Sequence, residues 1–136
     1  MKRVLWIIIV GCLFSLFSFG PALGQAQTVP KKSPELLAQG KKLYDQNCVT
    51  CHGPKGDGKG PVGVLLKPPS RDFNMPLTQW VHSKGDLKKV FDVISKGVPN
   101  TGMVSWAYLP EQDRWALVYY VEEFATSAKA APTKKK

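Results

Sequence analysis

The sequence predicts an all-α domain, and three observations lead to this prediction. Three segments place apolar side chains at helical spacing, and they comprise residues 34–47, 86–96 and 111–125. No segment shows a convincing alternation of apolar and polar residues, which would indicate a strand. Residues 53–76 contain so many glycines and prolines that neither a helix nor a central strand can form there. A loop of that length is uncommon in a compact domain, so we expect it to wrap around something.

The predicted helices carry start and stop signals. Ser33 is suited to cap the first helix, with Pro34 at its first position. Gly97 ends the second helix and Pro110 precedes the third. Gly40 lies inside the first helix, where glycine costs about 1 kcal/mol relative to alanine. We therefore expect another element to cross the first helix closely at Gly40.

The N-terminus has the layout of a secretory signal peptide. Lys2 and Arg3 precede an apolar run that ends in small residues. The run is also about long enough to cross a bilayer, so residues 1–24 are either a cleaved signal peptide or an uncleaved membrane anchor. Either way, we expect an exported protein in the periplasm or on the extracytoplasmic side of the membrane.

The remaining chain divides into a linker (25–32), one domain (33–126) and a disordered lysine-rich tail (127–136). The whole chain has 19 Lys and Arg against 10 Asp and Glu, a formal net charge of +9. Such a charge favours acidic partners. We expect no nucleic-acid partner, because no stripe of arginines with interleaved aromatic residues is present. Contact with a membrane is expected only through an uncleaved anchor.

The segment CVTCHG at residues 48–53 concentrates the chemically reactive residues. Once the leader with Cys12 is removed, Cys48 and Cys51 are the only cysteines. A disulfide between them would close a very small loop and stabilise little. A redox-active dithiol of the thioredoxin type needs a strand before it and a helix after it, which is the reverse of the order predicted here. Structural zinc needs four ligands, so His82 would have to complete a poor set in which Cys51 and His52 are adjacent.

Covalent haem fits this segment better than the other three interpretations. Cys-x-x-Cys-His is the haem attachment signature. The thiols of Cys48 and Cys51 would bind the porphyrin, and His52 would reach the iron. A haem would also supply hydrophobic mass, which a body of about 90 residues with three modest helices otherwise lacks.

The chain resembles a small monohaem c-type cytochrome of the His/Met type (class I) over residues 33–126. The marks of the resemblance are Gly40 and Tyr44 ahead of the CVTCHG motif, the segment from Gly97 to Trp106 that contains Gly102-Met103, and the closing helix with Trp115 to Phe124. The resemblance implies a cytochrome c-like fold. Three main helices and a long irregular loop would pack around one covalently bound haem c with its iron.

The resemblance places the second axial ligand of the iron at Met103. This residue lies 51 positions after His52, in an irregular turn before the last helix. The alternative interpretation is a methionine that only fills the core. Met75 is expected to pack on the edge of the ring. His82 is expected at the surface or near the haem propionates, and it keeps bis-histidine ligation open.

The resemblance also assigns supporting residues. The carbonyl group of a loop proline would hold the second ring nitrogen of His52, with Pro61 the first choice and Pro68 the second. Gly40 and Tyr44 would meet Tyr120 where the first and last helices cross. The candidates for hydrogen bonds to the haem propionates are Trp80, Arg71 and Trp106.

The function expected from these residues is a one-electron Fe(II)/Fe(III) shuttle between redox proteins, without substrate chemistry of its own. A surface ring of lysines would steer partners with acidic docking surfaces, and it draws on Lys41, Lys42, Lys55, Lys59 and Lys96. The alternatives are a haem-based sensor or carrier of diatomic gases, in which Met103 is labile, a haem enzyme, and a haem subunit of a larger oxidoreductase.

Overall fold

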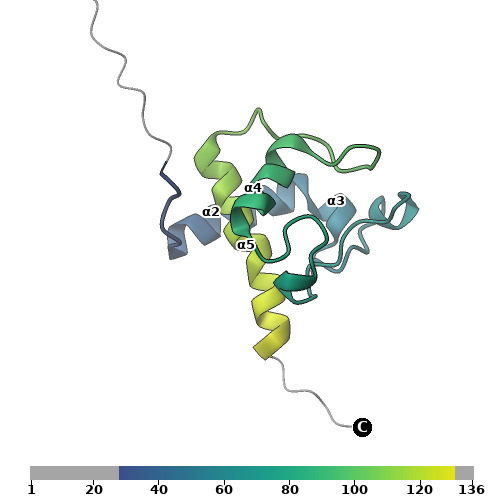
Figure 1. Cartoon of the computed structure of the whole chain (residues 1–136), viewed down its shortest axis with the longest axis horizontal. Coiled ribbons are helices and arrows are strands. Elements are labelled where there is room, and N and C mark those ends of the chain that lie inside the picture. Colours follow the sequence, from purple (N-terminus) through teal and green to yellow (C-terminus); the bar gives the residue numbers. More distant parts are fainter. Residues whose placement is uncertain (1–27, 131–136) are drawn as a thin grey trace, which may run out of the picture.

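The computed structural model describes residues 28–130. The expected leader (1–24), the first residues of the linker and the end of the expected tail (131–136) lie outside the described residues. The elements in chain order are α2 (Pro34–Asn47), α3 (Val49–His52), η1 (Gly63–Leu65), η2 (Leu77–Gln79), α4 (Leu87–Lys96) and α5 (Glu111–Ala130), where η denotes a 3₁₀ turn. No strand occurs between residues 28 and 130. The all-α prediction is therefore confirmed (Figure 1).

The caps of the helices follow the predicted signals. The Ser33 Oγ accepts a hydrogen bond from the Leu36 backbone N–H at 3.2 Å. Asp86, expected as the first residue of the second helix, is instead the N-cap of α4, and its carboxylate accepts from the Lys88 N–H at 2.9 Å. Gly97 ends α4 with a φ of 72°. The side chains of Ser33 and Asp86 thus satisfy backbone donors that the first turn leaves without a partner.

The last helix extends beyond its predicted end. We expected it to finish near residue 125 and a disordered tail to begin at residue 127, but α5 continues to Ala130. The sequence from Thr126 to Ala130 contains neither glycine nor proline, so nothing in it stops the helix. The first breaker is Pro132, which disfavours helical geometry in the residue before it.

The short helix α3 was not predicted. It follows α2 directly and carries the motif of residues 48–52. The Cys48 N–H still bonds to the Tyr44 carbonyl of α2, at 2.8 Å. Four residues are too few for a periodic apolar pattern to reveal a helix.

Helices α2 and α5 cross at Gly40, as predicted. A Cβ atom on Gly40 would overlap the backbone carbonyl of Ala116 and would lie 2.8 Å from the Tyr120 Cβ. Next to the crossing, the Tyr44 side chain is completely buried. Its ring lies 5.3 Å from those of both Tyr120 and Phe124, measured between centroids. The two helices form the principal helix pair of the domain (Figure 1).

The long loop wraps around α3. The Gly58 N–H donates to the His52 carbonyl at 2.9 Å, and the Val62 N–H donates to the Thr50 carbonyl at 3.0 Å. A Cβ atom on Gly63 would overlap the Cys51 carbonyl. The glycine at this position therefore allows the loop backbone to lie directly against the backbone of α3.

Within residues 28–130, no helix is both long enough and apolar enough to span a bilayer.

Replacement of Gly40 by alanine tests the helix crossing. Alanine improves helix propensity by about 1 kcal/mol, but its Cβ has no room against Ala116. We expect Gly40→Ala to destabilise the protein by about 1–3 kcal/mol, measured by urea unfolding. Ala38→Gly, on the exposed side of the same helix, reports propensity alone and should cost about 1 kcal/mol. A Gly40→Ala protein as stable as the native one would show that the helices do not meet as described.

Candidate functional site

The helices and the long loop enclose a cavity of about 470 Å³. Its walls come from α2, α3, α4, α5, the long loop and the turn before α5. The lining is mostly apolar and includes Leu66, Phe73, Val90, Ile94, Leu117 and Val121. A cavity of this size and character is typical of a site for a small molecule or a cofactor.

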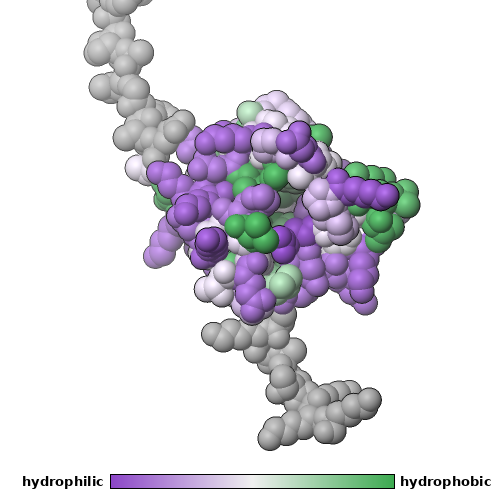
Figure 2. Space-filling view, turned by 45° about the vertical axis from the view of Figure 1, so that its right-hand side comes forward, coloured by the Kyte–Doolittle hydropathy of each residue, from purple (hydrophilic) through white to green (hydrophobic). Residues whose placement is uncertain are grey.

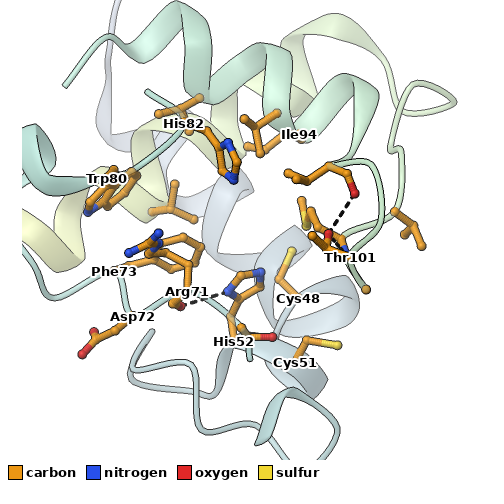
Figure 3. A pocket seen from close by; sticks show the side chains of 18 of the residues that line it. Cys48, Cys51, His52, Arg71, Asp72, Phe73, Trp80, His82, Ile94 and Thr101 are labelled. Atoms are coloured by element: carbon orange, nitrogen blue, oxygen red, sulfur yellow. Dashed lines mark hydrogen bonds between the residues drawn. The ribbon is translucent and has the colours of Figure 1, made fainter. Parts of the chain in front are cut away.

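The predicted motif forms one wall of this cavity. Cys48, Cys51 and His52 all line it, and both cysteines are free thiols (Figure 3). The His52 Nδ1 lies 3.3 Å from the Arg71 carbonyl oxygen. A carbonyl can only accept a hydrogen bond, so this contact puts the proton on Nδ1 and leaves a lone pair on Nε2.

The surroundings keep His52 neutral. Burial lowers the pKa of the His52 imidazole below its ordinary value, while the hydrogen bond to the Arg71 carbonyl acts in the opposite direction. The ring also stacks on Phe73, with centroids 4.5 Å apart and an angle of 21° between the planes. A neutral, oriented imidazole is the form that binds a metal ion.

The predicted proline acceptor for His52 is corrected by the structure. Neither Pro61 nor Pro68 holds the second ring nitrogen, since that contact belongs to the Arg71 carbonyl. Pro61 is exposed in the turn that packs on α3, and Pro68 lines the cavity. The loop then folds back, with the Ser70 N–H bonded to the Gly63 carbonyl at 3.2 Å. This reversal brings the backbone of residue 71 to the imidazole.

Met103 lines the same cavity from the turn between α4 and α5. Its carbonyl accepts from the Val98 N–H at 2.9 Å. Its own N–H donates to the Thr101 Oγ1 at 3.1 Å, and that hydroxyl donates to the Val98 carbonyl at 2.8 Å. The turn that carries Met103 is therefore held by internal hydrogen bonds, which use both the N–H and the carbonyl of Met103.

A second set of contacts fastens this turn to the helices. The Ser105 hydroxyl donates to the Ser95 carbonyl at 2.6 Å, and the Trp106 N–H donates to the Ile94 carbonyl at 3.0 Å. The Arg114 guanidinium of α5 donates to the Ser95 Oγ. Sequence reasoning missed Ser95, Ser105 and Arg114, because they lie far apart in the chain and match no motif.

The candidate polar groups around the cavity differ in what they contact. Trp80 also lines the cavity, and its N–H donates to the Met75 carbonyl at 3.0 Å, so this donor already has a partner within the protein. Arg71 and Trp106 line the same cavity, and their binding of propionates stays a prediction. The nearest hydrogen-bonding partner of the Arg71 guanidinium is the Met75 sulfur, at 4.0 Å.

Two further polar side chains line the cavity. Figure 3 shows the rings of His82 and His52 reaching into it from opposite sides. Ser83 is only 3% exposed, and its hydroxyl has no hydrogen-bond partner among the described residues. A buried hydroxyl without a partner is costly, which indicates a polar group of a bound molecule at this position. Sequence reasoning missed Ser83, because a serine just before a helix cap is an ordinary turn residue.

The structure disfavours two other interpretations of the motif. In the part of the chain that the structure describes, no cluster of three or more His, Cys, Asp or Glu side chains could hold a metal ion by itself. Burial, assisted by the nearby Cys51, raises the pKa of the Cys48 thiol to about 12. A redox-active dithiol needs the opposite, a thiol whose pKa is lowered toward neutrality.

Comparison with known proteins assigns the family. Residues 37–125 match the sequence model of the family described as Cytochrome c. The chain belongs to the cytochrome c family. The predicted cytochrome c-like fold is thereby confirmed, and haem c with its iron, bound covalently, is the cofactor of this family.

This cytochrome c is similar to two longer proteins. It is 28% identical over 96 residues to thiosulfate dehydrogenase of Thiomonas intermedia (strain K12), a match that covers 68% of this chain and 28% of that protein. Its fold is similar to that of a chain in the Kuenenia stuttgartiensis reducing HAO-like protein complex. That match has a TM-score of 0.60 and 26% identity, and it covers 80% of this chain and 50% of the other. The chain thus spans half or less of the length of these relatives.

The cavity of this cytochrome c fits a haem. Two free thiols and a neutral imidazole lie on one wall, and a methionine sulfur is available from another segment. The apolar lining suits a porphyrin, and the buried Ser83 hydroxyl needs a polar partner, which a propionate can provide.

Removal of the Ser105 hydroxyl tests the fastening of the Met103 turn. A hydrogen bond contributes a net of about 1 kcal/mol, so Ser105→Ala should speed amide hydrogen exchange at Val98 and Trp106 by roughly fivefold. Ser127→Ala, at an exposed position on α5, serves as the control and should leave both amides unchanged. Native exchange rates at Trp106 in Ser105→Ala would mean that this hydroxyl does not hold the turn.

Proposed function

We propose that this protein is an exported electron carrier that passes single electrons between redox proteins. The observation that carries the proposal is the pairing of His52 with Met103 on one cavity. The Arg71 carbonyl leaves the His52 Nε2 free to bind iron, and a hydrogen-bonded turn presents Met103 to the same space. Neither group has to move during electron transfer.

The roles of the motif residues follow from their positions. Cys48 and Cys51 would hold the haem covalently through their sulfur atoms, and His52 would be a ligand of its iron. Met103 would be the second ligand of the iron, and a thioether ligand favours the ferrous state and raises the reduction potential. When bound, the haem iron gains and loses one electron.

Three side chains are proposed to bind the haem propionates. The Arg71 guanidinium and the Ser83 hydroxyl both line the cavity and have donors available. Trp106 lines the same cavity from the turn after Met103. Trp80 acts through packing instead, because its N–H is bonded to Met75.

The fastening of the Met103 turn favours an electron carrier over a gas sensor or a haem enzyme. Both alternatives require an open coordination position at the iron. Here the Met103 turn is bonded to Val98 and Thr101, and the residues that follow are bonded to α4. These contacts fix the backbone that carries the Met103 side chain, which favours a ligand that stays in place.

The partner is proposed to be a larger oxidoreductase. The two relatives are named as a thiosulfate dehydrogenase and as a chain of a reducing HAO-like protein complex, and in both the matched region is a part of a longer protein. This chain would exchange electrons with an enzyme of that kind, either as a free carrier or as its haem subunit. Export is supported by the expected leader, which lies outside the described residues.

We propose that fewer lysines than expected attract the redox partner electrostatically. All five predicted lysines are exposed. However, Lys41 is paired with Asp45 at 2.6 Å, and Lys96 is paired with Asp92 at 3.3 Å. These acids cancel much of the field that Lys41 and Lys96 present, which leaves Lys42, Lys55 and Lys59 as the proposed steering charges.

An optical spectrum of the haem-loaded protein tests the proposed ligands. Ferric iron with His/Met ligation should show a weak far-red charge-transfer band. We expect Met103→Ala to abolish this band and to lower the reduction potential, because the thioether no longer stabilises the ferrous state. Met75→Ala, which removes the other methionine lining the cavity, should keep the band. A low-spin spectrum that is the same with and without Met103 would contradict the assignment and favour His82 as the ligand.

A further inference from the structure

One short segment of the long loop contacts the imidazole of His52 from two sides. The Arg71 carbonyl oxygen lies 3.3 Å from the His52 Nδ1, and the Phe73 ring stacks on the face of the imidazole with centroids 4.5 Å apart (Figure 3). A distance of 3.3 Å is longer than that of the usual N–H···O hydrogen bond, about 2.7–3.2 Å. The hydrogen bond by itself is therefore a weak restraint on rotation of the imidazole about its Cβ–Cγ bond.

The Phe73 ring supplies the stronger restraint. The planes of the two rings differ by only 21°, so the imidazole presents its flat face to Phe73. Rotation would turn an edge of the imidazole toward Phe73, and an edge extends farther from the centre of a ring than a face does. Aromatic pairs have centroids about 4.5–7 Å apart, so this pair is already at the close end of the range. The position of Phe73 thus leaves little room for the imidazole to rotate.

Phe73 is itself held by three other parts of the chain. Its backbone N–H donates to the Gly56 carbonyl at 2.6 Å. Its ring lies 5.1 Å from that of Trp80, which is only 4% exposed, and 6.3 Å from that of Phe124 on α5. Hydrophilic side chains cover most of the face shown in Figure 2, whereas these three rings belong to the packed apolar interior. Phe73 therefore cannot move away from His52 unless the neighbouring rings repack.

The restraint on the ring has a consequence for a bound iron. A hydrogen bond from Nδ1 makes the other nitrogen of an imidazole a more basic ligand. A more basic ligand stabilises ferric iron, and the protein uses such bonds to set the reduction potential. A side chain that keeps Nδ1 facing the Arg71 carbonyl thus acts on the iron through His52.

We propose that Phe73 is a positioning residue for His52. Its ring fixes the plane of the imidazole, keeps Nδ1 on the Arg71 carbonyl and thereby lowers the reduction potential of the iron. The inference rests on the proposed function, in which His52 binds the iron, and it names a residue outside the motif that controls this ligand.

The test compares the haem-loaded full chain with the variant Phe73→Leu, which keeps an apolar side chain but has no flat face. In the ferric protein, the proton NMR shifts of the haem methyl groups depend on the direction of the axial ligand planes. We expect Phe73→Leu to change the pattern of these shifts and to raise the reduction potential, because the imidazole is bonded to Arg71 for less of the time. Phe73→Tyr retains a flat ring and should restore the native pattern and potential.

The matched control is Phe91→Leu. Phe91 stacks on Trp115 with centroids 4.6 Å apart and an angle of 21°, nearly the geometry of the pair formed by Phe73 and His52. Phe91 is not among the residues that line the cavity. Both leucine variants should unfold at a lower urea concentration than the native protein, but Phe91→Leu should keep the native methyl shifts and potential. Phe73→Met, whose flexible side chain fills space in a different way, repeats the comparison in case Phe73→Leu does not fold.

Three outcomes would overturn the inference. Native methyl shifts and a native potential in Phe73→Leu and Phe73→Met would make Phe73 a core residue only. Equal changes in Phe91→Leu would indicate a general loosening of the domain. A Phe73→Tyr protein that behaves like Phe73→Leu would show that the flat ring is not what matters. In each case a reversible one-electron wave of the native protein would leave the proposed function standing, and the absence of that wave would remove the proposed function itself.

Discussion

The position of helix α3 is the constraint on which the rest of the structure depends. The four residues of α3 carry the Cys51 thiol and the His52 imidazole, and Cys48 is the N-cap. This short helix is held from two sides. The Tyr44 hydroxyl of α2 donates to the Gly53 carbonyl at 2.8 Å, just after α3 ends. On the other side, the loop donates from Gly58 to the His52 carbonyl and packs its glycines on the α3 backbone. With α3 fixed, the Arg71 carbonyl and the stacked Phe73 ring together set the direction of the His52 ring.

The same arrangement explains why so small a domain has a large apolar cavity. The α2 and α5 helices pack directly on each other at Gly40, and α4 packs on α5. Several other apolar side chains of α4 and α5 face the cavity, among them Ile94 and Leu117. A domain of about 100 residues buries too little apolar surface to tolerate an empty centre, so the haem completes the core. Haem binding and folding are thus coupled in this chain.

The sequence predicted the parts of the site that depend on local patterns. The cap residue Ser33 indicated the start of α2, and the motif at residues 48–52 indicated the residues that form one wall of the cavity. Gly40 indicated where the helices cross. What the sequence could not show depends on contacts between distant segments. The acceptor for His52 is a backbone carbonyl, which every residue has, so no residue type marks Arg71 for this role. The Ser95 and Ser105 contact and the buried Ser83 hydroxyl likewise become visible only when the chain is folded.

The most direct test of this account measures whether the fold needs its haem. The variant Cys48→Ala/Cys51→Ala, produced without covalent haem, would be compared with the haem-loaded protein by far-UV circular dichroism and urea unfolding. Our account predicts that the variant loses most of its helical signal and its cooperative unfolding transition, because the centre of the core is missing. A haem-free variant with native helicity and a native unfolding transition would contradict the claim that the domain is built around the cofactor.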